Sequence, residues 1–230
     1  MKIAVINFSG NVGKSTVARH LLAPRLKNAP VIPIETINAD DGLTDEAMKG
    51  KQYGQLLEAL AVTDNAVVDI GASNVEDVIT LMGQYKGSHE DFDCFVVPTA
   101  PVAKQMRDTI TTIEALSAIG VESSRIRVLF NMVDLGDAPA SLFASLFSYH
   151  ADRKNFKLSP GAVVHTNELY GKLQGRSIQE VLDDPTDYKQ LIKDSTDPGE
   201  KMKYSQALGV KRLAAGVLDE LDAAFKALLD

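Results

Sequence analysis

The sequence of 230 residues lacks most features that mark secreted, membrane-spanning or metal-binding proteins. Cys94 is its one cysteine, in an apolar run typical of a buried strand, so no disulfide forms within the chain and a reducing compartment is expected. No apolar run approaches the ~20 residues of a membrane helix, and the run at residues 3–6 is too short for a signal peptide. The four histidines follow no metal-ligand spacing. We therefore expect a soluble, cytoplasmic protein that does not use a membrane.

Positive charge is also scarce. The chain has 31 acidic against 24 basic residues, a net charge of −7, which disfavours broad electrostatic attachment to nucleic acid or anionic lipid. A local basic patch stays open as an alternative, and the sequence does not decide whether the protein contacts DNA directly. The hydrophobic content of 45% is enough for a full core, and no break in composition divides the chain. We predict one domain over residues 1–230.

The most informative stretch that is present is a glycine-containing segment at residues 7–16. An apolar, β-branched run precedes it and a helix-periodic segment follows from Val17, so the glycines lie on a strand-to-helix turn. Such a turn lets backbone N–H groups and the helix N-terminus face phosphate anions, which predicts a P-loop. An ordinary glycine-rich turn is the alternative. The predicted phosphate-binding residues are Ser9, Gly10, Asn11, Val12, Gly13, Lys14, Ser15 and Thr16.

Two residues of this segment have specific chemical roles in the prediction. Lys14 would contact the β- and γ-phosphates and act in catalysis, and Ser15 would ligate Mg²⁺. The segment Ser9–Ser15 resembles the deviant P-loop K-G-G-x-G-K-[ST] of the ParA/MinD family of ATPases, with Asn11 in place of the second glycine. The resemblance implies ATP and Mg²⁺ as cofactors and a nucleotide-dependent homodimer.

The resembled family has a signature lysine where this chain has Ser9. In the family that lysine reaches the nucleotide of the partner subunit, where it stabilises charge on the transferring phosphate. Serine supplies no positive charge, so we expect feeble hydrolysis by the isolated protein. Lys104 or Arg107 would have to substitute across the interface, or a partner protein would have to activate the site.

Acidic residues follow two of the predicted strands. The resemblance places a carboxylate that positions the attacking water after the second strand, and either Glu35 or Asp40 matches it; a solvated acidic loop is the alternative. Asp69, followed by Gly71, resembles the Walker B and switch II element. Asp69 would hold Mg²⁺ through a water and Gly71 would let the loop move with the γ-phosphate, unless Asp69 merely caps the next helix.

The predicted strand at residues 127–134 ends in N-x-x-D. Asn131 at the carboxyl edge of the strand would hydrogen-bond the base. Asp134 would read the ring N–H and amino group of guanine, or would cap a helix at residues 139–150. The family resemblance points to adenine.

Six apolar runs alternate with helical segments and predict the fold class. It is an α/β P-loop NTPase with a mostly parallel twisted sheet and helices on both faces. Pro24 is expected to end or kink the first helix, and Pro101 to begin the helix after the fourth strand. Residues 183–203 read as an exposed excursion or an ordered insert, and Val210–Leu228 as a terminal amphipathic helix. The predicted strands span residues 3–6, 31–35, 66–73, 92–99, 127–134 and 161–165.

The resemblance implies an ATP-binding, slowly hydrolysing switch that acts in plasmid stability or DNA segregation with a DNA-binding partner. The small size, Ser9 and the segment 31–41 are most similar to the plasmid-stability StbB branch. A nucleotide-gated adaptor with little hydrolysis is a second interpretation, favoured by the missing lysine. A P-loop small-molecule kinase is a third, but the sequence has no acceptor-binding motif beside the predicted switch II.

Overall fold

The computed structural model describes residues 1–34 and 45–230, with side chains from residue 52 onward in the second range. The chain divides into two compact units. The first is an α/β unit of residues Met1–Thr166 and Ala224–Asp230, and the second is a helical unit of residues Asn167–Ala223.

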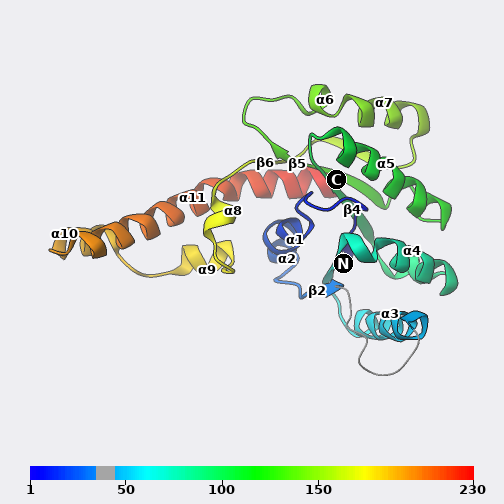
Figure 1. Ribbon diagram of the computed structural model, residues 1–230, viewed down its shortest axis with the longest axis horizontal. Helices are drawn as coiled ribbons and strands as arrows, with labels where there is room; N and C mark the ends of the chain where they lie inside the picture. The colour runs from blue at the N-terminus through cyan, green and yellow to red at the C-terminus, as the bar shows by residue number, and fades with distance from the viewer. Residues whose placement is uncertain (35–44) are drawn as a thin grey trace. The chain divides into compact units, whose positions relative to one another are not determined.

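A six-stranded sheet organises the first unit (Figure 1). All neighbouring strands are parallel, in the order β2-β3-β1-β4-β5-β6. Strand β1 lies between β3 and β4, and the connection that leaves β1 leads to one side of the sheet, whereas the connections that leave β4 and β5 lead to the other side. In open parallel sheets the carboxyl edge at such a reversal is where ligands bind. The strands are β1 Lys2–Val5, β2 Val31–Ile34, β3 Ala66–Ile70, β4 Cys94–Thr99, β5 Ile126–Val133 and β6 Lys157–His165.

The central strands are buried along their whole length. Every residue of β3 and β4 is buried, so both faces of the sheet are covered there, as parallel sheets require. Phe95 and Phe130 are fully buried, and each such side chain contributes about 1.5 to 3 kcal/mol. Cys94 is also buried, and burial raises the pKa of its thiol to about 12. The parallel α/β fold predicted from the alternating apolar runs is confirmed.

The first helix begins at Lys14 and has three consecutive parts, which are α1 Lys14–Thr16, η1 Val17–Leu22 and α2 Ala23–Arg25. Its middle part is a π-helix, and the helix ends one residue after Pro24, as expected for a residue without a backbone N–H. The Arg25 guanidinium donates to the carbonyl oxygens of His20 and Leu21 at 3.1 and 3.2 Å, which gives partners to carbonyls in the turn before the proline.

The remaining helices of the first unit connect the strands. The helix after β4 begins at Ala103, with Val102 at its N-cap, so the prediction that Pro101 occupies its first helical position was wrong. The bounds are α3 Asp45–Ala61, η2 Ala72–Asn74, α4 Val75–Gln84, η3 Ser88–Asp91, α5 Ala103–Ala118, α6 Pro139–Leu142 and α7 Ala144–Arg153.

The second unit is helical. A capping box begins α9, because the Ser177 hydroxyl accepts from the Glu180 N–H and the Glu180 carboxylate accepts from the Ser177 N–H. The helices are α8 Leu169–Lys172, α9 Ile178–Asp183, α10 Tyr188–Asp194 and α11 Pro198–Leu229, whose last turns belong to the first unit. None of the helices in the described ranges combines the length and the apolarity that crossing a bilayer requires.

Candidate nucleotide-binding site

The segment between β1 and α1 forms a loop that exposes a helix N-terminus. Gly13 is the N-cap of α1 at φ 80°, and Asn11 also has a left-handed backbone at φ 56°. Gly10, Asn11 and Ser15 are exposed, whereas Val12 is fully buried and anchors the loop. Exposed N–H groups at the start of a helix are a ready anion-binding site, so this geometry suits phosphate oxygens.

Gly13 cannot be replaced without a clash. A Cβ at this position would lie 2.3 Å from Nδ2 of Asn131, closer than real Cβ contacts allow. The same Nδ2 donates to the Val12 carbonyl oxygen at 2.9 Å, and Asn131 is 5% exposed. Asn131, predicted to contact the base, thus lies at the site and also holds the P-loop. The amide oxygen of its side chain is left to accept from a ligand.

A β-bulge explains how Asn131 reaches the loop. The pairing of β5 with β6 shifts between Asn131 and Val133, and the residue between them, Met132, has φ 56°. Bulges re-aim side chains near functional sites. Met132 is 42% exposed and its Cε would lie 3.6 Å from a Cβ at Gly13, so an apolar side chain borders the loop.

Lys14 points into the loop that precedes it. Its Nζ donates to the carbonyl oxygens of Ser9 at 2.7 Å and Asn7 at 3.1 Å, and the residue is 8% exposed. Burial lowers the pKa of Lys14, while the nearby Asp69 carboxylate acts to raise it. The Lys14 ammonium is therefore held near the N-terminus of α1 by two backbone carbonyl oxygens, which phosphate oxygens can replace as acceptors.

The predicted magnesium ligands lie on neighbouring elements. Asp69 pairs with Val5 across β3 and β1, two residues before the loop begins, and is 6% exposed. Ser15 is exposed in the first turn of α1. A carboxylate and a hydroxyl are oxygen ligands of the kind that Mg²⁺ prefers, so these residues fit the ion. Asp69 caps no helix, because η2 has Gly71 as its N-cap without a side-chain bond.

Gly71 ties the ends of two strands together. Its N–H donates to the Ile34 carbonyl oxygen at 3.0 Å, and Nδ2 of Asn74 donates to the same oxygen at 3.0 Å. A Cβ at Gly71 would lie 3.1 Å from both of these neighbours. The predicted residues Glu35 and Asp40 come after β2 in the sequence and lie outside the described residues.

A buried polar network supports the loop from α5, and the sequence analysis did not identify it. Nδ2 of Asn7 donates to Oγ1 of Thr109 at 2.8 Å and to the Pro98 carbonyl oxygen at 2.9 Å. Oδ1 of Asn7 accepts from the Ser9 N–H at 2.7 Å, and Oγ1 of Thr112 accepts from the Phe8 N–H at 3.1 Å. The sequence feature that could have indicated this network is the presence of Thr109 and Thr112 on the apolar face of the predicted helix after the fourth strand.

Ser9 is enclosed rather than free. It is 3% exposed, and its hydroxyl bonds the carboxylate of Asp108 on α5. Burial acts to raise the pKa of Asp108, but hydrogen bonds from Lys104 and Ser9 outweigh it and lower the pKa. Nζ of Lys104 lies 2.6 Å from that carboxylate. The exposed Arg107 is on the same helix.

Asp134 lies away from any cap. It is exposed and its carbonyl oxygen accepts from the Asp137 N–H at 3.1 Å in a turn. The N-cap of α6 is Ala138, which makes no side-chain cap bond, so the alternative that Asp134 caps this helix was wrong.

No protein-family model matches the chain, and no curated protein matches it in sequence. Solved structures resemble it in fold. Apo McdA of Cyanothece has a TM-score of 0.56 at 14% identity, covering 99% of this chain and 97% of McdA. A Cyanothece McdA variant solved in complex with ATP has a TM-score of 0.52 at 15% identity, covering 94% of this chain and 96% of the variant.

Two further structures extend the likeness. The cell division ATPase MinD of Pyrococcus furiosus has a TM-score of 0.52 at 15% identity, covering 92% of this chain and 98% of MinD. A ParA family ATPase of Chlorobium tepidum has a TM-score of 0.52 at 13% identity, covering 100% of this chain and 97% of that protein. The structural neighbours are thus ATPases of the ParA/MinD family, and this chain has their fold.

Proposed function

We propose that this chain is a switch protein of the ParA/MinD type that binds Mg²⁺-ATP at residues 9–16. The position of Lys14 is the observation that carries the proposal. Its ammonium lies within the loop, on two backbone carbonyls, beside an exposed helix N-terminus. Burying a lysine there without a carboxylate hydrogen bond costs free energy, and a polyphosphate that replaces the carbonyls would recover it.

The other proposed site residues surround this lysine. Ser15 and Asp69 would hold Mg²⁺, the latter through a water, and the ion would neutralise charge on the phosphates. Asn131 and Asp134 would border the base, with adenine preferred. Either Glu35 or Asp40 would orient the water that attacks the γ-phosphate.

The proposed cellular role is plasmid stability or DNA segregation, together with a DNA-binding partner protein. The nucleotide state would control homodimerisation and partner binding. The fold likeness to a ParA family ATPase supports the class of protein, and Ser9 together with the segment 31–41 supports the narrower StbB branch.

A nucleotide-gated adaptor with little hydrolysis is the second candidate, and one observation favours it. Ser9, in the place of the family's signature lysine, is buried and bonded to Asp108 in the same chain. No positive charge at this position reaches outward. The adaptor would cycle by nucleotide exchange rather than by turnover.

Calorimetry of Mg²⁺-ATP binding to the wild type and to Lys14→Ala tests the proposed binding site. We expect wild-type binding and a loss of at least roughly a hundredfold in affinity for Lys14→Ala, because a charge-assisted phosphate contact disappears. Lys86→Ala, which removes an equal charge from an exposed position after α4, is the matched control and should bind normally. Equal affinity in wild type and Lys14→Ala would rule out the P-loop function.

Steady-state ATPase measurements separate the two candidates. A slow ATPase should accelerate when its DNA-bound partner is added, whereas an adaptor should keep its low rate. A separate experiment, in which ATP and GTP compete for binding to the protein, measures which base is preferred. A GTP preference that Asp134→Ala abolishes would show that N-x-x-D reads guanine.

A further inference from the structure

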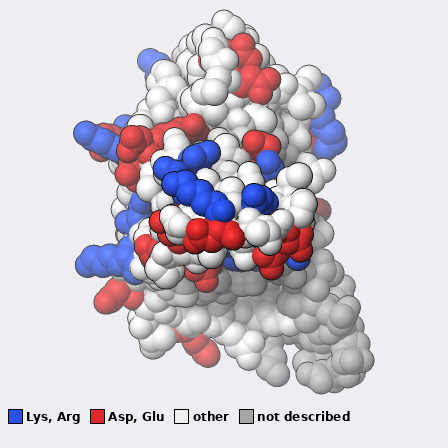
Figure 2. Space-filling view, turned by 90° about the vertical axis from the view of Figure 1, so that its left-hand side faces the viewer, with Lys and Arg blue, Asp and Glu red and all other residues white. Residues whose placement is uncertain are grey.

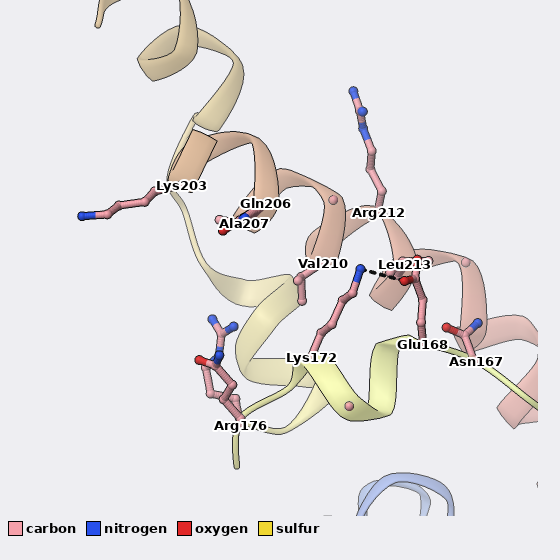
Figure 3. Close-up of a pocket in the computed structure, with 14 residues that line it drawn as sticks. Asn167, Glu168, Lys172, Arg176, Lys203, Gln206, Ala207, Val210, Arg212 and Leu213 are labelled. Carbon is pink, nitrogen blue, oxygen red and sulfur yellow. Dashed lines mark ion pairs between the residues drawn. The ribbon is translucent and has the colours of Figure 1, made fainter. Parts of the chain in front are cut away.

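The helical unit of residues 167–223 contains its own cavity. The cavity has a volume of about 800 Å³ and is lined by residues of α8, of the turn that follows it and of α11. This volume lies within the range of small-molecule sites. Four basic side chains line it, Lys172, Arg176, Lys203 and Arg212 (Figure 3).

The basic side chains are largely uncompensated. Glu168 is the acidic residue of the lining, and its carboxylate pairs with Nζ of Lys172 at 2.7 Å. Arg176, Lys203 and Arg212 make no ion pair with any residue that the structure describes. Figure 3 shows Lys172 extending from α8 toward α11, whereas Lys203 and Arg212 project in different directions from α11. Lys203 lies on the side of the helix that carries Ala207 and Val210, where its long side chain can turn onto a ligand, and Arg212 lies on the opposite side.

The cavity also has an apolar side. Ala207, Val210 and Leu213 contribute half-buried side chains from α11. Gly209 and Gly216 lie on the same helix, and a Cβ at either would meet nothing within 4 Å. Packing does not require these glycines, and their effect is to leave the helix surface open toward the cavity.

The turn after α8 holds a strained residue that lines the cavity. Gln174 has φ 51° and Gly175 has φ 85°, and the Arg176 N–H closes the turn on the Leu173 carbonyl oxygen at 3.0 Å. A non-glycine residue in this conformation costs of order 1–3 kcal/mol, and such residues gather at ligand clamps. The turn places the Gln174 carboxamide and the Arg176 guanidinium in the same lining.

The charge around the cavity limits what can enter it. Residues 167–223 include eleven acidic and eight basic residues, a net charge of −3. Figure 2 shows Lys and Arg side chains grouped with acidic side chains directly beside them. A long polyanion such as DNA would meet this surrounding negative charge, whereas a compact anion would meet only the basic lining.

We propose that this cavity binds a small phosphorylated molecule, with the phosphate on Arg176 and Lys203 and an apolar group on Val210 and Leu213. Guanidinium groups bind phosphate bidentately and give the site its selectivity for this anion. No residue of the P-loop lines this cavity, and the proposal does not rest on the function proposed for that loop.

The test titrates the full-length Lys14→Ala variant with inorganic phosphate and with phenyl phosphate, followed by NMR and calorimetry without magnesium. The Lys14→Ala background weakens phosphate binding at the P-loop. We expect one remaining site that prefers phenyl phosphate, since both probes carry the phosphate and only one has an apolar group. Adding Arg176→Ala and Lys203→Ala should weaken binding roughly tenfold or more.

Adding Lys189→Ala and Lys201→Ala instead is the matched control, because these exposed lysines of the same unit change the net charge equally and do not line the cavity. Arg176→Lys with Lys203→Arg should retain part of the affinity, which separates a binding loss from misfolding. Equal weakening by both alanine pairs would overturn the proposal, as would no binding of either probe. Tighter binding of a short DNA duplex or of anionic vesicles at the same residues would also overturn it.

Discussion

Gly13 shows how one residue determines the shape of the candidate site. Its φ of 80° is unfavourable for any side chain, and a Cβ would also collide with the Asn131 amide at 2.3 Å. Gly13→Ala should therefore lower the free energy of unfolding by about 2 to 3 kcal/mol and weaken Mg²⁺-ATP binding. Urea unfolding and calorimetry measure the two effects.

Gly10 offers the matched control for that substitution, since a Cβ there meets nothing within 4 Å and its φ is not positive. Gly10→Ala should cost less than about 0.5 kcal/mol. In an Asn131→Ala background the clash is gone, so Gly13→Ala should cost less than in the wild type. Equal costs in the two backgrounds would show that backbone strain alone fixes this residue.

The lowered pKa of Lys14 predicts that both the stability of the fold and the affinity for nucleotide depend on pH. Burial lowers its pKa below the usual 10.5, so the charged form opposes folding at neutral pH and this penalty disappears as pH rises through the lowered pKa. Phosphates bind the charged form. The affinity for ADP without magnesium should therefore fall as pH rises, beginning below 10.5, and calorimetry in buffers of different ionisation enthalpy should detect proton uptake.

The Asp69 carboxylate supplies the control, because it raises the Lys14 pKa. Asp69→Asn should shift the fall in ADP affinity to lower pH. An affinity that stays constant up to pH 10.5 would mean that Lys14 does not contact the phosphates.

At the scale of elements, α5 supports the P-loop through its threonines. Thr109 is fully buried and accepts from Asn7, while its hydroxyl lies 3.0 Å from that of Thr99. Thr109→Val keeps the shape and leaves the Asn7 amide with one fewer acceptor, so it should cost about 1 to 3 kcal/mol and weaken nucleotide binding.

Thr111→Val on the exposed face of the same helix is the control. Its hydroxyl bonds only the Arg107 carbonyl oxygen of its own helix, so the substitution should change stability by less than about 0.5 kcal/mol. Thermal unfolding and calorimetry compare the two variants. Equal effects would mean that the loop does not depend on the buried network.

The elements differ in how far the sequence predicts them. Apolar, β-branched runs locate all six strands, and the reason is clearest for β3 and β4, which are buried at every position. Strand β6 begins at Lys157, four residues before the predicted range of 161–165, because its first residues are largely exposed and follow no apolar run. The helices within residues 183–203 are less predictable from the sequence, because Pro185 and Pro198 indicate interruptions of helical structure. Pro198 instead begins α11, a position where its missing N–H costs nothing. The π-helix at residues 17–22 has no sequence signature.

In the candidate site, too, the sequence predicts local features and misses contacts between residues that are distant in the chain. The loop at residues 7–16 is predictable because its spacing is local. The bond from Asn131 to Val12 joins residues 119 apart, and the bond from Asn7 to Thr109 joins residues 102 apart. No local pattern specifies such contacts, so the sequence predicted Asn131 as a base-binding residue but not the hydrogen bond by which it holds the loop.

At the scale of the whole molecule, the question is whether one chain holds all the charge that hydrolysis needs. Phosphoryl transfer requires positive charge on the transferring oxygens, and a missing cation of this kind lowers rates by ~10³ or more. Ser9 is buried against Asp108, and Lys104 is already paired with that carboxylate. The isolated protein should therefore hydrolyse ATP feebly.

Asp108 allows a more specific test of whether the missing positive charge at residue 9 limits hydrolysis. A lysine at residue 9 would meet the Asp108 carboxylate, which Lys104 and Ser9 keep ionised by lowering its pKa, and would stay within its own chain. Ser9→Lys alone should thus gain little turnover. Ser9→Lys with Asp108→Asn should gain roughly tenfold or more, because the ammonium is then released toward a facing copy. Asp108→Asn alone is the control and should stay slow.

Arg107 is the remaining cation of α5 that a facing copy would meet, since it is exposed and makes no ion pair with any residue that the structure describes. If it substitutes for the missing lysine, Arg107→Ala should abolish the residual turnover in a steady-state ATPase assay. Turnover that is brisk in the wild type, survives Arg107→Ala and gains nothing from Ser9→Lys with Asp108→Asn would mean that charge across an interface does not limit hydrolysis by this protein.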